Sequence, residues 1–197
     1  KSLLDIGGIQ PIVRIVNLLT DHGIKDILVV VGYKKEKIMS ALGSKVAFHE
    51  FSDFETKNNL HTLWSARGKI AGDILILYAD LIFEPEVIKK MLAHPGDVCL
   101  AVDTSMLRPE SPQVRIENGA ITKVGKENPT CNFLGITKFS SRGALEFVKA
   151  METLVTKNPN AYYSDAINIL IEKGVPATPV DIAGSKWIEI DTPEDLE

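Results

Sequence analysis

The sequence has few cysteines and lacks long apolar or basic runs. Cys99, in an apolar segment, and Cys131, in a polar segment that we expect to be a loop, are the two cysteines among 197 residues, which is too few for a disulfide framework. No apolar run approaches the roughly 20 residues of a membrane span, and the first residues lack a signal-peptide pattern. The net charge is -4 and basic residues form no long cluster, which argues against nucleic-acid binding. These absences favour a cytoplasmic location.

The alternation of apolar patterns predicts one α/β domain. With 45% hydrophobic residues, the chain is long enough for one core and short for two. We expect helices at 11–22, 34–42, 59–71, 85–94, 142–156 and 163–173, and strands at 26–31, 46–50, 74–80, 98–102, 113–116, 120–124, 132–139, 175–182 and 186–190. Strands that alternate with helices indicate a doubly wound, mostly parallel, Rossmann-like mixed sheet. The Asn118-Gly119 turn adds a small antiparallel hairpin.

Two aspartates follow strands that lie far apart in the sequence. The run Ile74-Leu-Ile-Leu-Tyr-Ala ends at Asp80, a pattern typical of a strand buried on both faces. Lys186-Trp-Ile-Glu-Ile likewise ends at Asp191. Ligands of open α/β sheets bind beyond the carboxyl ends of the strands, so both acids are candidate metal ligands. Each also has a structural alternative, since Asp80 can cap a turn and Asp191 can cap a helix that begins at Thr192-Pro193.

The beginning of the chain lacks an expected element. A doubly wound sheet normally opens with a central strand and a phosphate-binding loop, and neither pattern precedes the helix at 11–22. We therefore expect 1–197 to be a single domain without its first strand and Gly-rich loop. Either the chain is a fragment or residues precede Lys1 in a longer protein, and we favour the second alternative.

Three segments together resemble the sugar-nucleotidyltransferase-like family. They are Lys1-Ser-Leu-Leu-Asp-Ile-Gly-Gly-Ile-Gln-Pro-Ile, Tyr78-Ala-Asp80 and Trp187-Ile-Glu-Ile-Asp191-Thr-Pro-Glu-Asp-Leu. The resemblance extends over essentially the whole chain. It implies the nucleotide-diphospho-sugar transferase fold, a catalytic Lys1, and Mg²⁺ held by Asp80 and Asp191.

A fourth segment narrows the resemblance. Lys57-Asn-Asn-Leu-His-Thr-Leu-Trp64 looks like the Asn-Asn segment of phosphocholine and 2-aminoethylphosphonate cytidylyltransferases. The run around Asp80 is similar to nucleotidyltransferase domains fused to phosphoenolpyruvate mutases. These resemblances imply transfer of CMP from CTP to a small phosphate or phosphonate acceptor, with release of pyrophosphate. We also expect either a homodimer or a fusion of this domain to another enzyme domain.

Further side chains are candidates for binding the two substrates. For the nucleotide they are Gly32, Asn59, Thr62 and Asp80, and for the acceptor they are Asn58, Trp64, Asp103, Lys126, Tyr163, Asp165 and Glu189. Trp64 and Tyr163 could form an aromatic wall against an ammonium head group. Plainer alternatives exist, because asparagine and threonine at a helix start can be caps, a helical tryptophan is more often part of the core, and Lys126 can be solvated.

Three other functions compete with cytidylyl transfer. A nucleotidyltransferase for sugar-1-phosphate or inositol-1-phosphate keeps the metal ligands, but the Asn58-Asn59 segment argues against a sugar. A metal-dependent glycosyltransferase would carry Asp-x-Asp, whereas Leu81-Ile82 follow Asp80. A non-catalytic regulatory domain would be expected to have lost one aspartate, and both are present.

Overall fold

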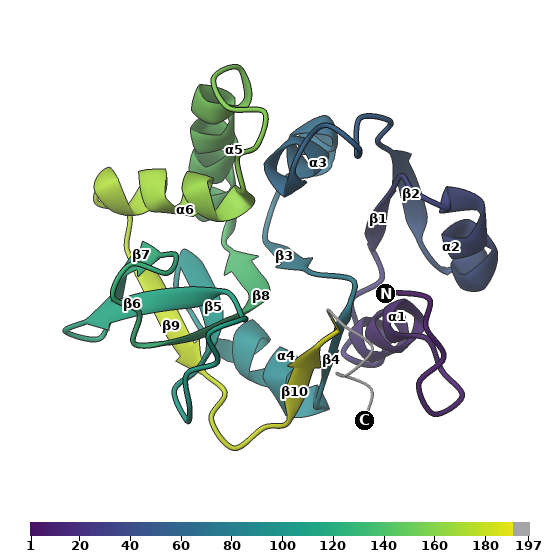
Figure 1. Ribbon diagram of the computed structural model, residues 1–197, viewed down its shortest axis with the longest axis horizontal. Coiled ribbons are helices and arrows are strands. Elements are labelled where there is room, and N and C mark those ends of the chain that lie inside the picture. Colours follow the sequence, from purple (N-terminus) through teal and green to yellow (C-terminus); the bar gives the residue numbers. More distant parts are fainter. Residues whose placement is uncertain (191–197) are drawn as a thin grey trace.

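The computed structural model describes residues 1–190 (Figure 1). The helices are α1 (Pro11–Asp21), α2 (Lys35–Leu42), α3 (Asn59–Ser65), α4 (Pro85–Ala93), α5 (Ser141–Val155) and α6 (Tyr163–Glu172), with short 3-10 turns η1 (Gly43–Lys45) and η2 (Arg67–Lys69). The strands are β1 (Leu28–Val31), β2 (Ala47–Glu50), β3 (Ile74–Leu77), β4 (Leu81–Phe83), β5 (Val98–Asp103), β6 (Gln113–Glu117), β7 (Ala120–Val124), β8 (Cys131–Phe139), β9 (Ala177–Asp181) and β10 (Trp187–Glu189). This is the α/β mixed-sheet fold that the alternating pattern predicts.

Strand β8 organises the main sheet. The strand order is β7-β6-β8-β5-β9, and β3 also pairs with β8. Since β5 occupies one edge of β8 along its length, β6 and β3 share the other edge, β6 at Cys131–Asn132 and β3 at Ile136–Phe139. All three neighbours run antiparallel to β8. Antiparallel pairing is therefore more extensive than the single hairpin that the sequence predicts.

Two hydrophobic clusters lie on opposite faces of this sheet. One packs α3, α5 and α6 against residues such as Leu100 and Phe133. The other packs α1 and α4 against residues such as Ala101 and Leu134. Neighbouring residues of β5 and β8 thus alternate between the clusters, as side chains of successive strand residues must. The helices consequently cover both faces, as Figure 1 shows.

Two smaller sheets complete the architecture. β1 and β2 form a parallel pair, and β4 and β10 form an antiparallel pair. Strand β4 is absent from the sequence-based expectation, because its three residues are too short to show a period. Within residues 1–190 no helix is long and apolar enough to cross a membrane.

Two expectations about burial are wrong. All four residues of β3 are half-buried rather than buried on both faces, and within residues 1–190 this strand forms a ladder with β8 alone. The fully buried strand is β5, which has a bonded neighbour on each edge. Cys131 begins β8 and is buried, not placed in a loop, because its neighbours Val114 and Phe133 carry it into the core.

The predicted hairpin is confirmed. β6 and β7 are joined by Asn118-Gly119, whose φ angles are 52° and 79°. Positive φ at both central residues is typical of a type I′ turn, whose twist matches that of the flanking strands. On the far edge of β7, the Asn168 side chain of α6 accepts from the Val124 N–H and donates to the Val124 carbonyl, both at 2.8 Å. One buried amide therefore takes the place of a further strand at this position.

We predict that Asn168→Ala lowers the free energy of unfolding by about 3 kcal/mol, because it removes two hydrogen bonds and leaves two buried backbone groups without partners. Chemical denaturation measures the change. Glu172→Ala, at an exposed position of the same helix, serves as the control and should change stability by less than about 0.5 kcal/mol. Equal, small effects of both variants would contradict this role of Asn168.

Candidate functional site

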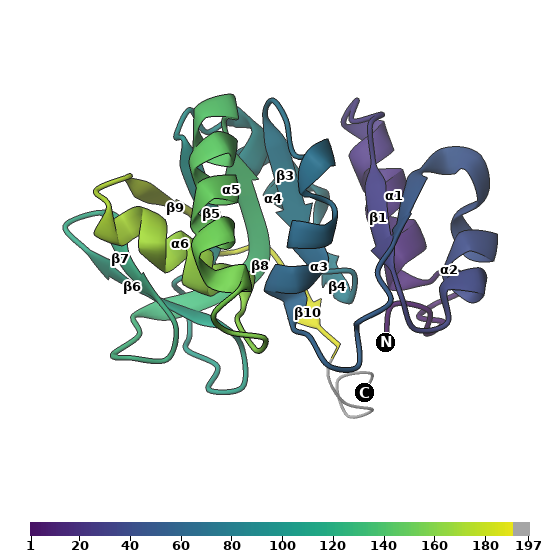
Figure 2. The same cartoon turned by 90° about the horizontal axis from the view of Figure 1, so that it is seen from above.

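The topology brings the ends of several strands to one edge of the molecule. β3 and β5 both run antiparallel to β8, so they are parallel to each other and their carboxyl ends lie at the same edge. Asp80 follows β3, and Asp103 ends β5. Figures 1 and 2 both place the N-terminus of the chain beside the end of β10, at this edge. Residues from the beginning, middle and end of the sequence therefore meet here.

The pairing of β4 with β10 fixes the neighbours of Asp80. Glu189 lies opposite Leu81, and the Ile190 backbone N–H donates to the Asp80 carbonyl at 3.0 Å. The two strand-end segments predicted to carry the metal ligands are thus bonded to each other. Asp191 itself lies outside the described residues.

Asn59 joins three elements at this edge. Its side-chain oxygen accepts from the Tyr163 N–H at the start of α6, at 2.8 Å, and its side-chain nitrogen donates to the Tyr78 hydroxyl, at 3.3 Å. The Tyr163 ring is fully buried, with its edge toward Tyr78 at 5.7 Å between centroids and its hydroxyl 3.3 Å from Thr137 Oγ1. The Asn59 amide and the two phenols therefore form one connected polar group. Sequence analysis did not select Tyr78, whose position inside an apolar run concealed it.

The acids of this edge act on the two phenols. Burial raises the pKa of Tyr78 well above its ordinary value, and the negative charge of Glu189 raises it further, with a smaller effect from Asp80. Burial likewise raises the pKa of Tyr163, and Glu189 contributes there as well. Both tyrosines are therefore neutral at physiological pH. The negative charge of Glu189 therefore acts on both phenols.

Asp103 has a full set of internal partners. It is 4% exposed and accepts from the Ser105 N–H and hydroxyl and from Trp187 Nε1, the last at 2.7 Å. Burial by itself would raise the pKa of Asp103, but the hydrogen bonds from Ser105 and Trp187 outweigh burial, so its pKa lies below the ordinary value of 3.8. The guanidinium of Arg108 covers the Trp187 ring, 4.6 Å from its centroid. Asp103 thus ties β5 to β10, and substrate contact by this residue stays a prediction.

The remaining candidates for acceptor binding also have structural partners. Asn58 caps α3 and donates to the Asn160 carbonyl. Asp165 caps α6 by accepting from the Tyr162 N–H. Lys126 is exposed and donates to the Pro109 carbonyl, and the Trp64 ring is covered by the Arg67 guanidinium at 4.2 Å. Trp64, which the sequence analysis proposed as a contact for a cationic head group, is therefore already in contact with a cation of the same chain, Arg67.

Three further candidates are Thr62 and Gly32, predicted to bind the nucleotide, and Lys1, predicted to be catalytic. Thr62 is half-buried on α3, one turn after Asn59. Gly32 follows β1, and a β-carbon there would lie 2.6 Å from the Phe54 ring, so only glycine lets this ring pack on the backbone. Lys1 is exposed, and its carbonyl accepts from the Leu4 N–H. The roles predicted for these residues stay predictions.

The chemistry of the edge suits a magnesium ion. Within residues 1–190 no three His, Cys, Asp or Glu side chains gather into a metal site. Mg²⁺ is usually held by one or two carboxylates together with water and substrate phosphates. A half-buried Asp80 bonded through its backbone to the segment before Asp191 fits that pattern.

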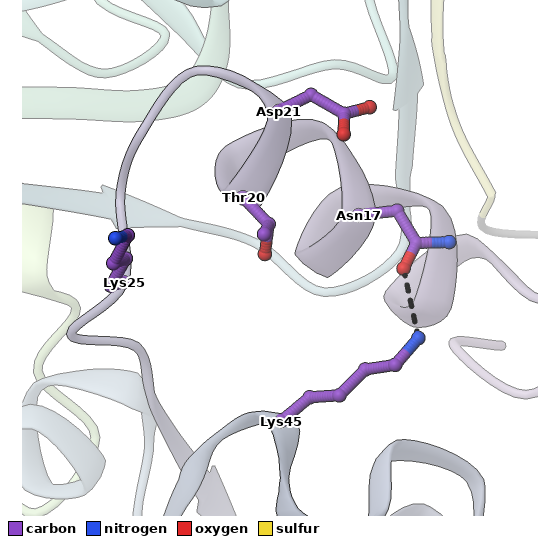
Figure 3. A pocket seen from close by; sticks show the side chains of 5 residues that line it. All are labelled: Asn17, Thr20, Asp21, Lys25 and Lys45. Carbon is purple, nitrogen blue, oxygen red and sulfur yellow. Dashed lines mark hydrogen bonds between the residues drawn. The ribbon is translucent and has the colours of Figure 1, made fainter.

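A surface pocket of about 480 Å³ lies at the opposite edge (Figure 3). It is lined by Asn17, Thr20, Asp21, Lys25 and Lys45. Lys25 and Lys45 precede β1 and β2, so the pocket lies at the amino ends of these strands. None of the predicted site residues lines it.

Comparison with known proteins identifies the family. Residues 1–117 match the MobA-like NTP transferase domain, more than half of the chain. The chain belongs to this family. The MobA-like NTP transferases are nucleotidyltransferases, so the resemblance found in the sequence is confirmed.

Curated relatives of this NTP transferase domain include several cytidylyltransferases. The chain is 28% identical over its full length to a bifunctional IPC transferase and DIPP synthase of Rubrobacter xylanophilus, of which it covers 46%. It is 26% identical to the CTP:phosphoglutamine cytidylyltransferase of Campylobacter jejuni, with 92% of the chain and 83% of that protein covered. It is 25% identical to a 2-aminoethylphosphonate cytidylyltransferase of Lancefieldella rimae, with 85% and 70% covered. The chain spans about half the length of its bifunctional relatives.

Solved structures share the fold of the NTP transferase domain. The inositol-1-phosphate CTP transferase from T. maritima superposes with a TM-score of 0.81 at 16% identity, covering 100% of this chain and 82% of that one. The CTP:phosphocholine cytidylyltransferase from Streptococcus pneumoniae gives 0.81 at 16% identity, with 98% and 85% covered. At this identity the likeness concerns the fold alone.

We predict that Asp103→Asn lowers the free energy of unfolding at pH 7 by about 2 kcal/mol. The Asp103 carboxylate accepts from Ser105 with one oxygen and from Trp187 with the other, whereas an amide has a single acceptor oxygen and would lose one of these partners. The folded-state pKa is depressed, so the stabilisation is present above pH 3.8 and is lost as the pH falls through the folded-state value. The difference between wild type and variant, measured by denaturation, should therefore narrow in acid. An unchanged stability combined with a raised KM for the acceptor would instead favour substrate binding.

Proposed function

We propose that this domain is a Mg²⁺-dependent cytidylyltransferase that transfers CMP from CTP to a small phosphate or phosphonate acceptor and releases pyrophosphate. The observation that carries the proposal is the backbone bond between Ile190 and Asp80, which joins the two segments that end in acids. Relatives that align over most of the chain are named as cytidylyltransferases, one of CTP and phosphoglutamine and one of 2-aminoethylphosphonate.

The reaction requires no nucleophile from the protein. An oxygen of the acceptor phosphate or phosphonate, already negatively charged, forms a bond to the α-phosphorus of CTP. The bond from that phosphorus to the bridging oxygen breaks, and pyrophosphate leaves with the electron pair. A divalent cation supplies charge neutralisation and alignment in such a reaction. The chain must therefore bind two anionic substrates side by side and hold them in line.

Residues at the carboxyl ends of the strands would have separate roles in this reaction. Asp80, together with Asp191, would hold the ion. Lys1 would neutralise charge on the α-phosphate and the departing pyrophosphate, and the Gly32 backbone with Thr62 would contact the nucleotide. The negative charge of Glu189 raises the pKa of Tyr78 and of Tyr163, and its carboxylate would attract an ammonium group of the acceptor. This arrangement favours an acceptor with a small cationic head group.

Inositol-1-phosphate is the second candidate acceptor. The full-length alignment with the bifunctional IPC transferase, and the shared fold of the inositol-1-phosphate CTP transferase, support it. Such an acceptor has hydroxyl groups and no cation, so the Glu189 carboxylate would accept hydrogen bonds rather than pair with a positive charge. The two candidates share CTP and differ only at the acceptor.

A pyrophosphate-release assay separates the acceptors. We predict release with CTP and Mg²⁺ when phosphocholine, 2-aminoethylphosphonate or a phosphorylated amino-acid amide is supplied, and at least about tenfold less with glucose-1-phosphate, because Glu189 favours a cation by more than about 1.4 kcal/mol. Strong release with inositol-1-phosphate and none with the cationic acceptors would establish the second candidate. Equal use of all four nucleoside triphosphates would contradict the assignment of CTP.

Substitution of Asp80 tests the metal assignment. We predict that Asp80→Asn reduces turnover at least about a hundredfold, because the amide loses the charge that holds the cation against the phosphates. Its melting temperature should stay within a few degrees of wild type, since the backbone bond to Ile190 does not depend on the side chain. Asp21→Asn, the same change at the opposite edge, is the control and should leave both quantities unchanged. A large loss of stability in Asp80→Asn would favour a capping role.

A further inference from the structure

Tyr78 occupies the turn that carries Asp80, between β3 and β4. Its backbone N–H donates to the Gly135 carbonyl of β8 at 3.3 Å, and its ring lies directly on that glycine. A β-carbon on Gly135, whose φ is 73°, would be 2.3 Å from Tyr78 Cδ2. Ring and glycine are therefore matched, and any side chain at 135 would displace the ring. This contact holds the beginning of the turn to the main sheet.

The hydroxyl of Tyr78 holds the turn from the other side. Asn59 Nδ2 donates to it at 3.3 Å, while the oxygen of the same amide accepts from the Tyr163 N–H at 2.8 Å. Both polar groups of the Asn59 side chain thus have partners within the protein. The amide connects the start of α3, the start of α6 and the turn before Asp80.

The end of the turn is held by β10. The Asp80 carbonyl accepts from the Ile190 N–H at 3.0 Å, and Ile190 is 1% exposed. Between Tyr78 and this bond lies a single residue, Ala79. The backbone of Asp80, from which its carboxylate projects, is consequently held by the Tyr78 anchor on one side and by the β10 bond on the other.

We propose that Tyr78 is a positioning residue, whose hydroxyl, held by Asn59, fixes the Asp80 turn relative to the nucleotide side of the site. Tyr78 touches neither the metal nor the reacting atoms in this role. The inference rests on the proposed function for its catalytic consequence, but its structural content, the anchoring of the turn, is independent of any substrate. Outer contacts of this kind orient metal ligands, and their loss typically weakens metal binding about 10- to 100-fold.

Tyr78→Phe removes the hydroxyl and keeps the ring on Gly135. We expect a magnesium half-saturation constant raised about tenfold, with KM for the acceptor changed less than about twofold. Hydrogen exchange of the Ile190 amide reports the bond to Asp80 without substrate or activity, and it should become about tenfold faster. Amides of the fully buried β5 serve as the internal reference for global unfolding.

Thr137→Val is the matched control. It also removes a buried hydroxyl, the one 3.3 Å from the Tyr163 hydroxyl, so it alters the far end of the same polar group and leaves the bond between Asn59 and the Tyr78 hydroxyl in place. Relative to the β5 reference, its Ile190 exchange and its magnesium constant should equal those of wild type. A similar change in both variants would show a general effect of hydroxyl loss and overturn the proposal, as would Ile190 exchange in Tyr78→Phe within about twofold of wild type. If wild type released no pyrophosphate with any acceptor, the proposed function would fail, and the Ile190 exchange would still decide the role of Tyr78.

Discussion

The antiparallel pairing of β4 with β10 is the contact on which the candidate site depends. It joins segments about a hundred residues apart through three residue pairs, extended by the bonds from Glu84 to Lys186 and from Ile190 to Asp80. Short two-stranded ladders are marginal alone. Here Leu81, Phe83 and Trp187 are buried in the cluster that includes α1 and α4, and this burial stabilises the pair. The placement of the acids is thus a consequence of core packing.

Most elements could be predicted because their signals are local. The alternation of apolar runs predicted every helix and nine of the strands, most to within three residues, and Asn118-Gly119 specified the hairpin turn. The exception is α3, which ends at Ser65, six residues before the predicted end at 71. The partners of each strand could not be predicted, because pairing depends on contacts between distant residues. The sequence therefore did not predict that β8 has three antiparallel neighbours, or that β3 is only half-buried.

The sequence marks Asp80 but not the contacts that support it. Asp80 stands at the end of an apolar run, and its role as a metal ligand stays a prediction. Tyr78 and Gly135, in contrast, become informative only when β3 lies beside β8, because neither residue belongs to a sequence pattern that signals a contact. Trp64 was expected to face a ligand, but a sequence does not show that Arg67 will cover its ring. Side-chain partners across elements are a property of the folded chain.

The Asn168 amide also has a consequence for the behaviour of the protein in concentrated solution. β7 is a terminal strand of the main sheet, and such strands offer unpaired backbone groups to other molecules. At Val124 both of those groups are already bonded to Asn168, and α6 lies across this part of the strand. A second molecule therefore cannot extend the sheet at this end of β7, so the helix that supplies Tyr163 to the site also protects the sheet from edge-to-edge aggregation.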